Sequence, residues 1–89
     1  MVNLTPSATK SKHIEYFDFA VYENVIVDKS DTLTLSEFLL SAGALTQALL
    51  VDNSDGSEIA TTITMNVVTV TGDATDKDCT LFAYGRRAA

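Results

Sequence analysis

The sequence predicts a mainly β fold, a small antiparallel β-sandwich or barrel of about six strands with one short helix. Threonine is abundant and sits beside Val, Ile, Phe and Tyr, the residue types that suit a pleated, half-buried surface. Short apolar runs alternate with polar turn segments, as in all-β domains. The 89 residues fit one domain, and the four glycines and one proline are few enough to mark real boundaries.

Residues 1–12 are expected to form a polar N-terminal arm, because they are rich in Ser, Thr and Lys and show no periodicity. A long strand is expected over residues 13–27, where apolar side chains occupy both parities. A surface strand of a monomer alternates more cleanly. This strand is therefore predicted to be central in a sandwich, or to meet another subunit with its second face. Asp18 is expected on its outward face.

A short strand over residues 32–35 is predicted after the polar turn at residues 28–31. One helix is predicted next, with Thr34 and Glu37 as its capping box and Gly43 as the residue that ends it. The apolar residues between them follow the i, i+3, i+4, i+7 spacing of one helical face: Leu35, Phe38, Leu39 and Ala42.

The second half of the chain reads as strands joined by turns. Asp55-Gly56 is a hairpin signal, and a parity switch places a tight turn at Met65-Asn66, with a bulge as the alternative. The strands expected around these turns cover residues 44–51, 57–64, 67–71 and 79–84. The single β domain is thus expected over residues 13–85, followed by a basic tail at 86–89.

Charge is distributed unevenly along the chain. All 12 acidic residues lie between Glu15 and Asp78, where only two lysines accompany them, so this body carries −10. The four remaining cations give +4 at the two ends, for a net charge of −6: Lys10, Lys12, Arg86 and Arg87. An acidic body disfavours nucleic acid and anionic membranes as partners. The basic ends are either solvated termini or arms that lie on an acidic neighbour.

No catalytic constellation is evident, and we expect the protein not to be an enzyme. His13 and Cys79 are the only histidine and cysteine, and a cysteine on an apolar strand is usually an inert core residue. No Gly-rich phosphate loop is present, and neither a cofactor nor a metal is expected. Calcium would be the best metal guess, although Gly56 is at the wrong offset for an EF-hand. Its candidate ligands are two acidic loop clusters: Asp52, Asp55 and Glu58, and Asp73, Asp76 and Asp78.

Self-association is expected because a domain of this size buries only a modest share of its surface. A single cysteine excludes an internal disulfide that could compensate for the small core. Tyrosines, which combine an apolar ring with a polar tip, suit interfaces. The interface candidates are the tyrosines and the cations of the two ends: Lys10, Lys12, Tyr16, Tyr22, Tyr84, Arg86 and Arg87. No signal peptide or transmembrane run is predicted.

Three segments resemble small virion structural proteins, particularly capsid decoration (cement) proteins of tailed phages. They are VDNSDGS at residues 51–57, TTITMNVVTVTG at 61–72 and the closing TLFAYGRR at 80–87, behind the polar N-terminal arm. The resemblance implies a β-sandwich-like oligomer, often a trimer, that staples neighbouring major capsid subunits of a virion. Alternatives are a filament or pilus-like fibre subunit and a small ligand-binding β-sandwich, and the alternative location is the cytoplasm. A ligand-binding module would need exposed aromatic residues on one flat face.

Overall fold

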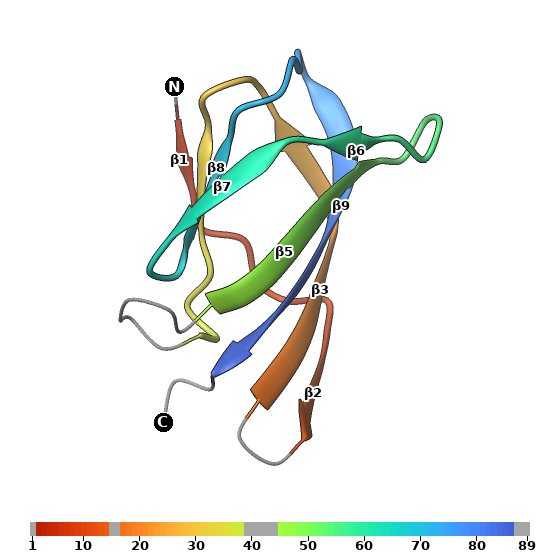
Figure 1. Ribbon diagram of the computed structural model, residues 1–89. Helices are drawn as coiled ribbons and strands as arrows, with labels where there is room; N and C mark the ends of the chain where they lie inside the picture. The colour runs from red at the N-terminus through yellow and green to blue at the C-terminus, as the bar shows by residue number, and fades with distance from the viewer. Residues whose placement is uncertain (1, 15–16, 39–44, 87–89) are drawn as a thin grey trace.

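The computed structural model describes residues 2–14, 17–38 and 45–86, which form nine strands in two sheets (Figure 1). The mainly β prediction is confirmed, although the described residues form nine strands rather than the six expected. The strands are β1 (Asn3–Leu4), β2 (Lys10–Ile14), β3 (Phe17–Val27), β4 (Thr32–Thr34), β5 (Leu45–Asp52), β6 (Glu58–Ile59), β7 (Thr61–Thr64), β8 (Val67–Val70) and β9 (Lys77–Arg86).

The larger sheet is antiparallel throughout and has the strand order β2-β3-β9-β5-β6. The smaller sheet has the order β1-β4-β8-β7 and contains one parallel pair, β1 with β4. The core lies between the sheets, because each strand turns alternate side chains inward. Its fully buried side chains are Tyr22, Val27, Leu33, Leu35, Phe38, Leu50, Val68, Val70, Cys79 and Leu81.

The predicted helix is wrong where the structure describes it. Residues 35–38 form a turn and a bridge, and residues 39–44 lie outside the described part of the chain. Leu35 and Phe38 are buried in the core, so their apolar spacing reflects burial rather than a helical face. Glu37 does not cap a helix. Its Oε1 accepts a 2.6 Å hydrogen bond from the Tyr22 hydroxyl, and its Oε2 accepts a 3.3 Å hydrogen bond from the Ala8 amide.

The long strand predicted over residues 13–27 is two strands. β2 pairs antiparallel with the first half of β3, with Lys10 opposite Val21 and Ile14 opposite Phe17. Residues 3–4 and 10–12 of the expected N-terminal arm therefore belong to the two sheets. The Val2 amide is also held, by a 2.9 Å hydrogen bond to Oδ1 of the buried Asp31.

A bulge in β3 accounts for part of the apolar character on both parities of this segment. Tyr22 pairs with Leu81 and Val25 with Cys79, so β3 gains one residue relative to β9. Asn24 has a φ of 58° at this point. The extra residue changes which parity faces the core, so Tyr22 and Val27 are both buried although their numbers differ in parity.

The predicted turns are confirmed. The hairpin between β7 and β8 turns at Met65-Asn66, where Met65 has a φ of 56°, and the β5–β6 loop contains Gly56 with a φ of 76°. The strand predicted over residues 57–64 is divided between the two sheets at Ala60. The Ala60 carbonyl at this crossing accepts hydrogen bonds from the amides of Thr71 and Gly72.

Candidate interaction surface

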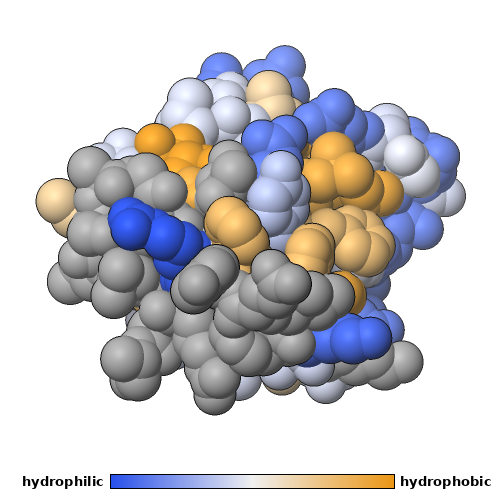
Figure 2. Space-filling model, turned by 60° about the horizontal axis from the view of Figure 1, so that its bottom comes forward, coloured by the Kyte–Doolittle hydropathy of each residue, from blue (hydrophilic) through white to orange (hydrophobic). Residues whose placement is uncertain are grey.

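The outer face of the five-stranded sheet carries a cluster of apolar side chains, which we call the apolar stripe: Phe17, Phe19, Val21, Leu49, Phe82 and Tyr84. All except the half-buried Val21 keep between 37% and 44% of their surface exposed. Figure 2 looks onto the end of the molecule that is lowest in Figure 1, and it shows hydrophobic residues reaching the surface among hydrophilic ones. Isolated exposed apolar residues are ordinary, but a contiguous group marks a candidate contact surface.

The alternation of the central strands places these side chains together. In β9, Cys79, Leu81 and Ala83 face the core, whereas Phe82 and Tyr84 face outward. The register brings Phe19 opposite Tyr84 on the neighbouring strand. Residues that pair across antiparallel strands share a face, so β3, β9 and β5 each contribute to one outer surface.

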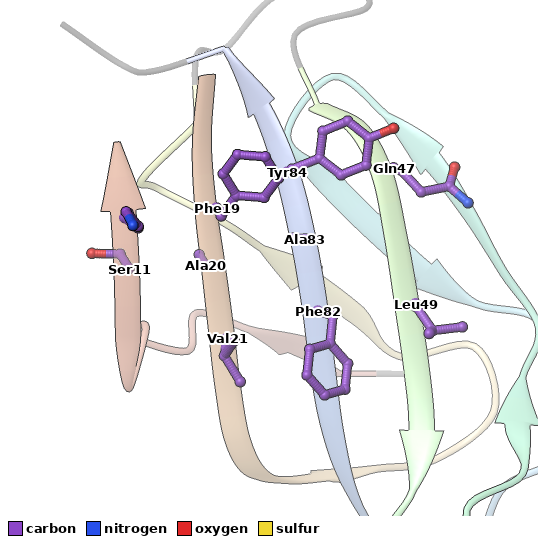
Figure 3. Close-up of a pocket in the computed structure, with 10 residues that line it drawn as sticks. Ser11, Phe19, Ala20, Val21, Gln47, Leu49, Phe82, Ala83 and Tyr84 are labelled. Carbon is purple, nitrogen blue, oxygen red and sulfur yellow. The ribbon is translucent and has the colours of Figure 1, made fainter. Parts of the chain in front are cut away.

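The apolar stripe borders a shallow groove of about 390 Å³ (Figure 3). The rings of Phe19 and Tyr84 stack along it, with centroids 5.6 Å apart and an interplanar angle of 25°. Lys12 and Gln47 belong to its polar lining, on strands that flank β3 and β9. This stacking orients the two exposed rings relative to each other, and such preorganisation favours binding to a partner.

Three interface candidates named from the sequence lie on this face. Tyr84 belongs to the apolar stripe, Lys12 lines the groove, and Arg86 is exposed at the end of β9 with the parity of Tyr84. Lys10 pairs with Val21 in the register of β2 and β3. The remaining candidates at this end, Tyr16 and Arg87, lie outside the described residues.

Tyr22 is predicted as an interface candidate, and this prediction is wrong, because Tyr22 is fully buried on the inner face of the sheet. Burial and the hydrogen bond to Glu37 both raise the pKa of its hydroxyl. Asp18 shares the inward parity of Tyr22, so its predicted outward placement is wrong as well. The bulge after Tyr22 explains the error. Odd-numbered residues of β3 face outward before the bulge and inward after it, so a single alternation cannot be counted along the whole strand.

The sequence does not single out Phe19, Phe82 and Leu49 as surface residues, because large apolar side chains usually lie in the core. The available clue was the apolar character of both parities in residues 17–21 and 79–84. A strand whose sheet packs on the core with one face and meets water with the other needs apolar residues on one parity only.

The acidic loops use their carboxylates within the turns. Oδ1 of Asp52 accepts hydrogen bonds from the amide and hydroxyl of Ser54, and Oδ1 of Asp55 does the same with Ser57. These bonds lower the pKa of both carboxyls, and Lys77, 3.2 Å from Oδ2 of Asp52, contributes to the effect on Asp52. No group of three or more potential metal ligands gathers within residues 2–14, 17–38 and 45–86.

Cys79 is buried in the core as predicted, and burial raises the pKa of its thiol. The described part of the chain also contains no helix with the length and apolar character that crossing a bilayer requires. Comparison of the chain with protein-family models, with curated proteins and with solved structures finds no match.

Proposed function

We propose that this protein is a non-enzymatic structural component of a virus particle, a capsid decoration protein that self-associates and docks on a larger shell. The observation that carries the self-association is the apolar stripe on the outer face of the five-stranded sheet. Burying partly exposed aromatic and aliphatic side chains stabilises a complex by about 25 cal/mol per Å² of apolar surface, before the costs of association. Aromatic residues are also enriched in the centres of protein interfaces.

The size of the outer face is compatible with a specific contact. Ten residues of β9 extend about 33 Å and five strands span about 19 Å, so the sheet presents roughly 600 Å² in projection. A standard interface buries about 800 Å² of accessible surface per partner. Accessible surface exceeds projected area because side chains make the face rough, so this face alone approaches the area that a stable contact needs.

The placement on a capsid rests on the resemblance of three segments to decoration proteins, at residues 51–57, 61–72 and 80–87. Two of these segments meet in the structure. Residues 51–57 include the end of β5 and its turn, and residues 80–87 include most of β9, which pairs with β5. Mass spectrometry of purified particles of the source virus tests this part of the proposal. Recovery of the chain at a fixed ratio to the major capsid protein is expected, and its absence from the particles would contradict the assignment.

The molecular mass in solution tests the self-association. Sedimentation velocity over a wide concentration range is expected to show one discrete oligomer of fixed size. Growth without a limiting size would favour the filament or pilus-like fibre subunit. A chain that remains monomeric at high concentration would overturn the assembly function.

A small ligand-binding β-sandwich is the second candidate, because Phe19, Phe82 and Tyr84 lie on one sheet face beside a groove. Such grooves accept apolar or ring-shaped ligands that stack on aromatic side chains. Chemical-shift titration with a panel of simple sugars and aromatic compounds distinguishes the two. Saturable shifts confined to the apolar stripe in a monomeric chain would favour the ligand-binding function.

A further inference from the structure

The charged residues around the apolar stripe are not distributed evenly. Lys12 lies on β2, at one edge of the five-stranded sheet, and Arg86 lies at the end of β9, and both have the outward parity. Glu58 lies on β6, at the opposite edge of the sheet, and Asp78 lies near the start of β9, again with outward parity. All four side chains are exposed. The outer face therefore has a cationic corner (Lys12 and Arg86) and a diagonally opposite acidic corner (Glu58 and Asp78).

The register shows that the two corners are well separated. Lys12, Phe19, Tyr84 and Gln47 form one row across the sheet. Val51 pairs with Glu58 and with Thr80, which lies four residues from Tyr84 along β9, so the row of Glu58 is displaced by about 13 Å along the strands. Across the strands, β2 and β6 are the two edges of the sheet. The apolar stripe occupies the area between the corners.

We infer that the apolar stripe binds the same stripe of a second copy of this chain, face to face about a two-fold axis, with the cationic corner of each copy over the acidic corner of the other. This inference rests on the self-association proposed above and makes its unit a two-fold dimer, so a discrete trimer in solution would overturn it and leave the self-association standing. A two-fold contact uses the same patch on both copies, so the patch must complement itself. A face with opposite charges at diagonal corners meets this condition when the axis runs diagonally between the two sheets.

The diagonal axis is selected over the alternatives by charge. With an axis perpendicular to the strands through the row of Phe82, β2 of one copy would lie over β2 of the other, so Lys12 would lie about 13 Å from its own counterpart and over neither Glu58 nor Asp78. With an axis parallel to the strands, β9 would lie over β9 in the same direction, and Arg86 would meet Arg86. Only the diagonal axis avoids the contact between the two Arg86 residues and places both Lys12 and Arg86 of each copy over the acidic corner of the other.

Charge reversal on each corner tests this geometry. The first variant carries Lys12→Glu and Arg86→Glu, and the second carries Glu58→Lys and Asp78→Lys. Each variant alone would oppose like charges at both contacts, so at ionic strength of about 50 mM its association is expected to be at least tenfold weaker than that of the wild-type chain. An equimolar mixture of the two variants would oppose unlike charges again, and a heterodimer of the two is expected to form. Far-ultraviolet circular dichroism checks that each variant is folded.

The outcomes separate this inference from the function on which it rests. Wild-type chains that do not associate at all would overturn both. Wild-type association together with unchanged association of either variant would overturn the corner pairing and leave the self-association standing. Two weakened variants that fail to recover on mixing would overturn the two-fold face-to-face arrangement. A chain that carries all four reversals is expected to associate as strongly as the wild-type chain, because its corners are complementary again.

Discussion

The Tyr22 hydroxyl donates a 2.6 Å hydrogen bond to Oε1 of Glu37, linking the centre of β3 to the turn that follows β4. Tyr22 is fully buried, so this bond satisfies a hydroxyl that water does not reach. Glu37 also accepts a 3.3 Å hydrogen bond from the Ala8 amide, which connects the N-terminal segment to the same carboxylate. One side chain therefore holds three separate parts of the chain together.

Tyr22→Phe is expected to lower the free energy of unfolding by about 1–3 kcal/mol, because the variant loses a hydrogen bond to a carboxylate in a buried site. Urea denaturation followed by circular dichroism measures this loss. Tyr84→Phe is the matched control, since Tyr84 is on the outer face and partly exposed. Equal stability of the two variants would contradict the role given to the Tyr22–Glu37 bond.

Tyr22 also makes the stability fall at alkaline pH. The pKa of its hydroxyl is raised in the folded chain by burial and by Glu37. The unfolded chain releases this proton near its ordinary pKa of about 10, whereas the folded chain retains it. The contribution is complete below about pH 10 and is lost as the pH rises above that value. Tyr22→Phe should lack this part of the alkaline loss in urea titrations.

Asp31 anchors the N-terminal strand. Its buried carboxylate accepts hydrogen bonds of 2.9 Å from the amides of Val2 and Asp28. Asp31→Ala is expected to lower the free energy of unfolding by about 1–3 kcal/mol, since two amides lose their acceptor. Asp73→Ala is the control, because Asp73 is fully exposed and its 3.4 Å ion pair with Lys29 contributes about 0–1 kcal/mol. Hydrogen exchange should show β1 losing protection only in the Asp31 variant.

Asp52 gives the protein part of its stability toward acid. Its pKa is lowered by the hydrogen bonds from Ser54 and by Lys77, and that of Asp55 is lowered by Ser57. A lowered folded-state pKa contributes stability above the unfolded value of about 3.9 and loses it as the pH falls through the folded value. Urea titrations below about pH 4 are therefore expected to decline less steeply for Asp52→Asn than for the wild-type chain. Parallel curves for the two proteins would exclude this assignment.

Cys79 should be chemically silent in the folded chain. Burial, with smaller effects from Asp52 and Asp78, raises the pKa of the thiol, and the side chain has no exposed surface. The thiolate is the reactive form of cysteine, so both effects slow its reaction. A chromogenic aromatic disulfide that reacts with thiols is expected to modify Cys79 only when the protein is unfolded in urea. Rapid reaction of the native chain would show that Cys79 is accessible and would reopen a chemical role for it.

The sequence predicts the β class, the turn at Met65-Asn66 and the hairpin at Asp55-Gly56, because these features depend on local backbone preference. It does not predict where the strands divide. Residues 57–64 look like one strand, but the chain changes sheet at Ala60. The false helix has a similar origin, since Leu35 and Phe38 have helical spacing but are buried by long-range packing.

The candidate surface is predictable only in part. Apolar residues on both parities of β3 indicate that a second face is apolar, and the exposure of Phe17 and Phe19 agrees with that expectation. The bulge after Tyr22 shifts the register by one residue, which also places apolar residues on both parities. Sequence parity alone therefore cannot separate core from surface residues in β3. The partners Phe82 and Leu49 come from distant segments and join the surface only through the register of β9 with β3 and β5.

The central claim is that the apolar stripe mediates self-association, and the dissociation constant of paired variants tests it most directly. Phe82→Ser removes a ring from the middle of the stripe, whereas Met65→Ser removes a similarly exposed apolar side chain from the β7–β8 turn in the other sheet. Sedimentation equilibrium is expected to show at least tenfold weaker association for Phe82→Ser, corresponding to about 1.4 kcal/mol or more, and wild-type association for Met65→Ser. Equal association of the wild-type chain and both variants would show that the stripe is not the contact surface.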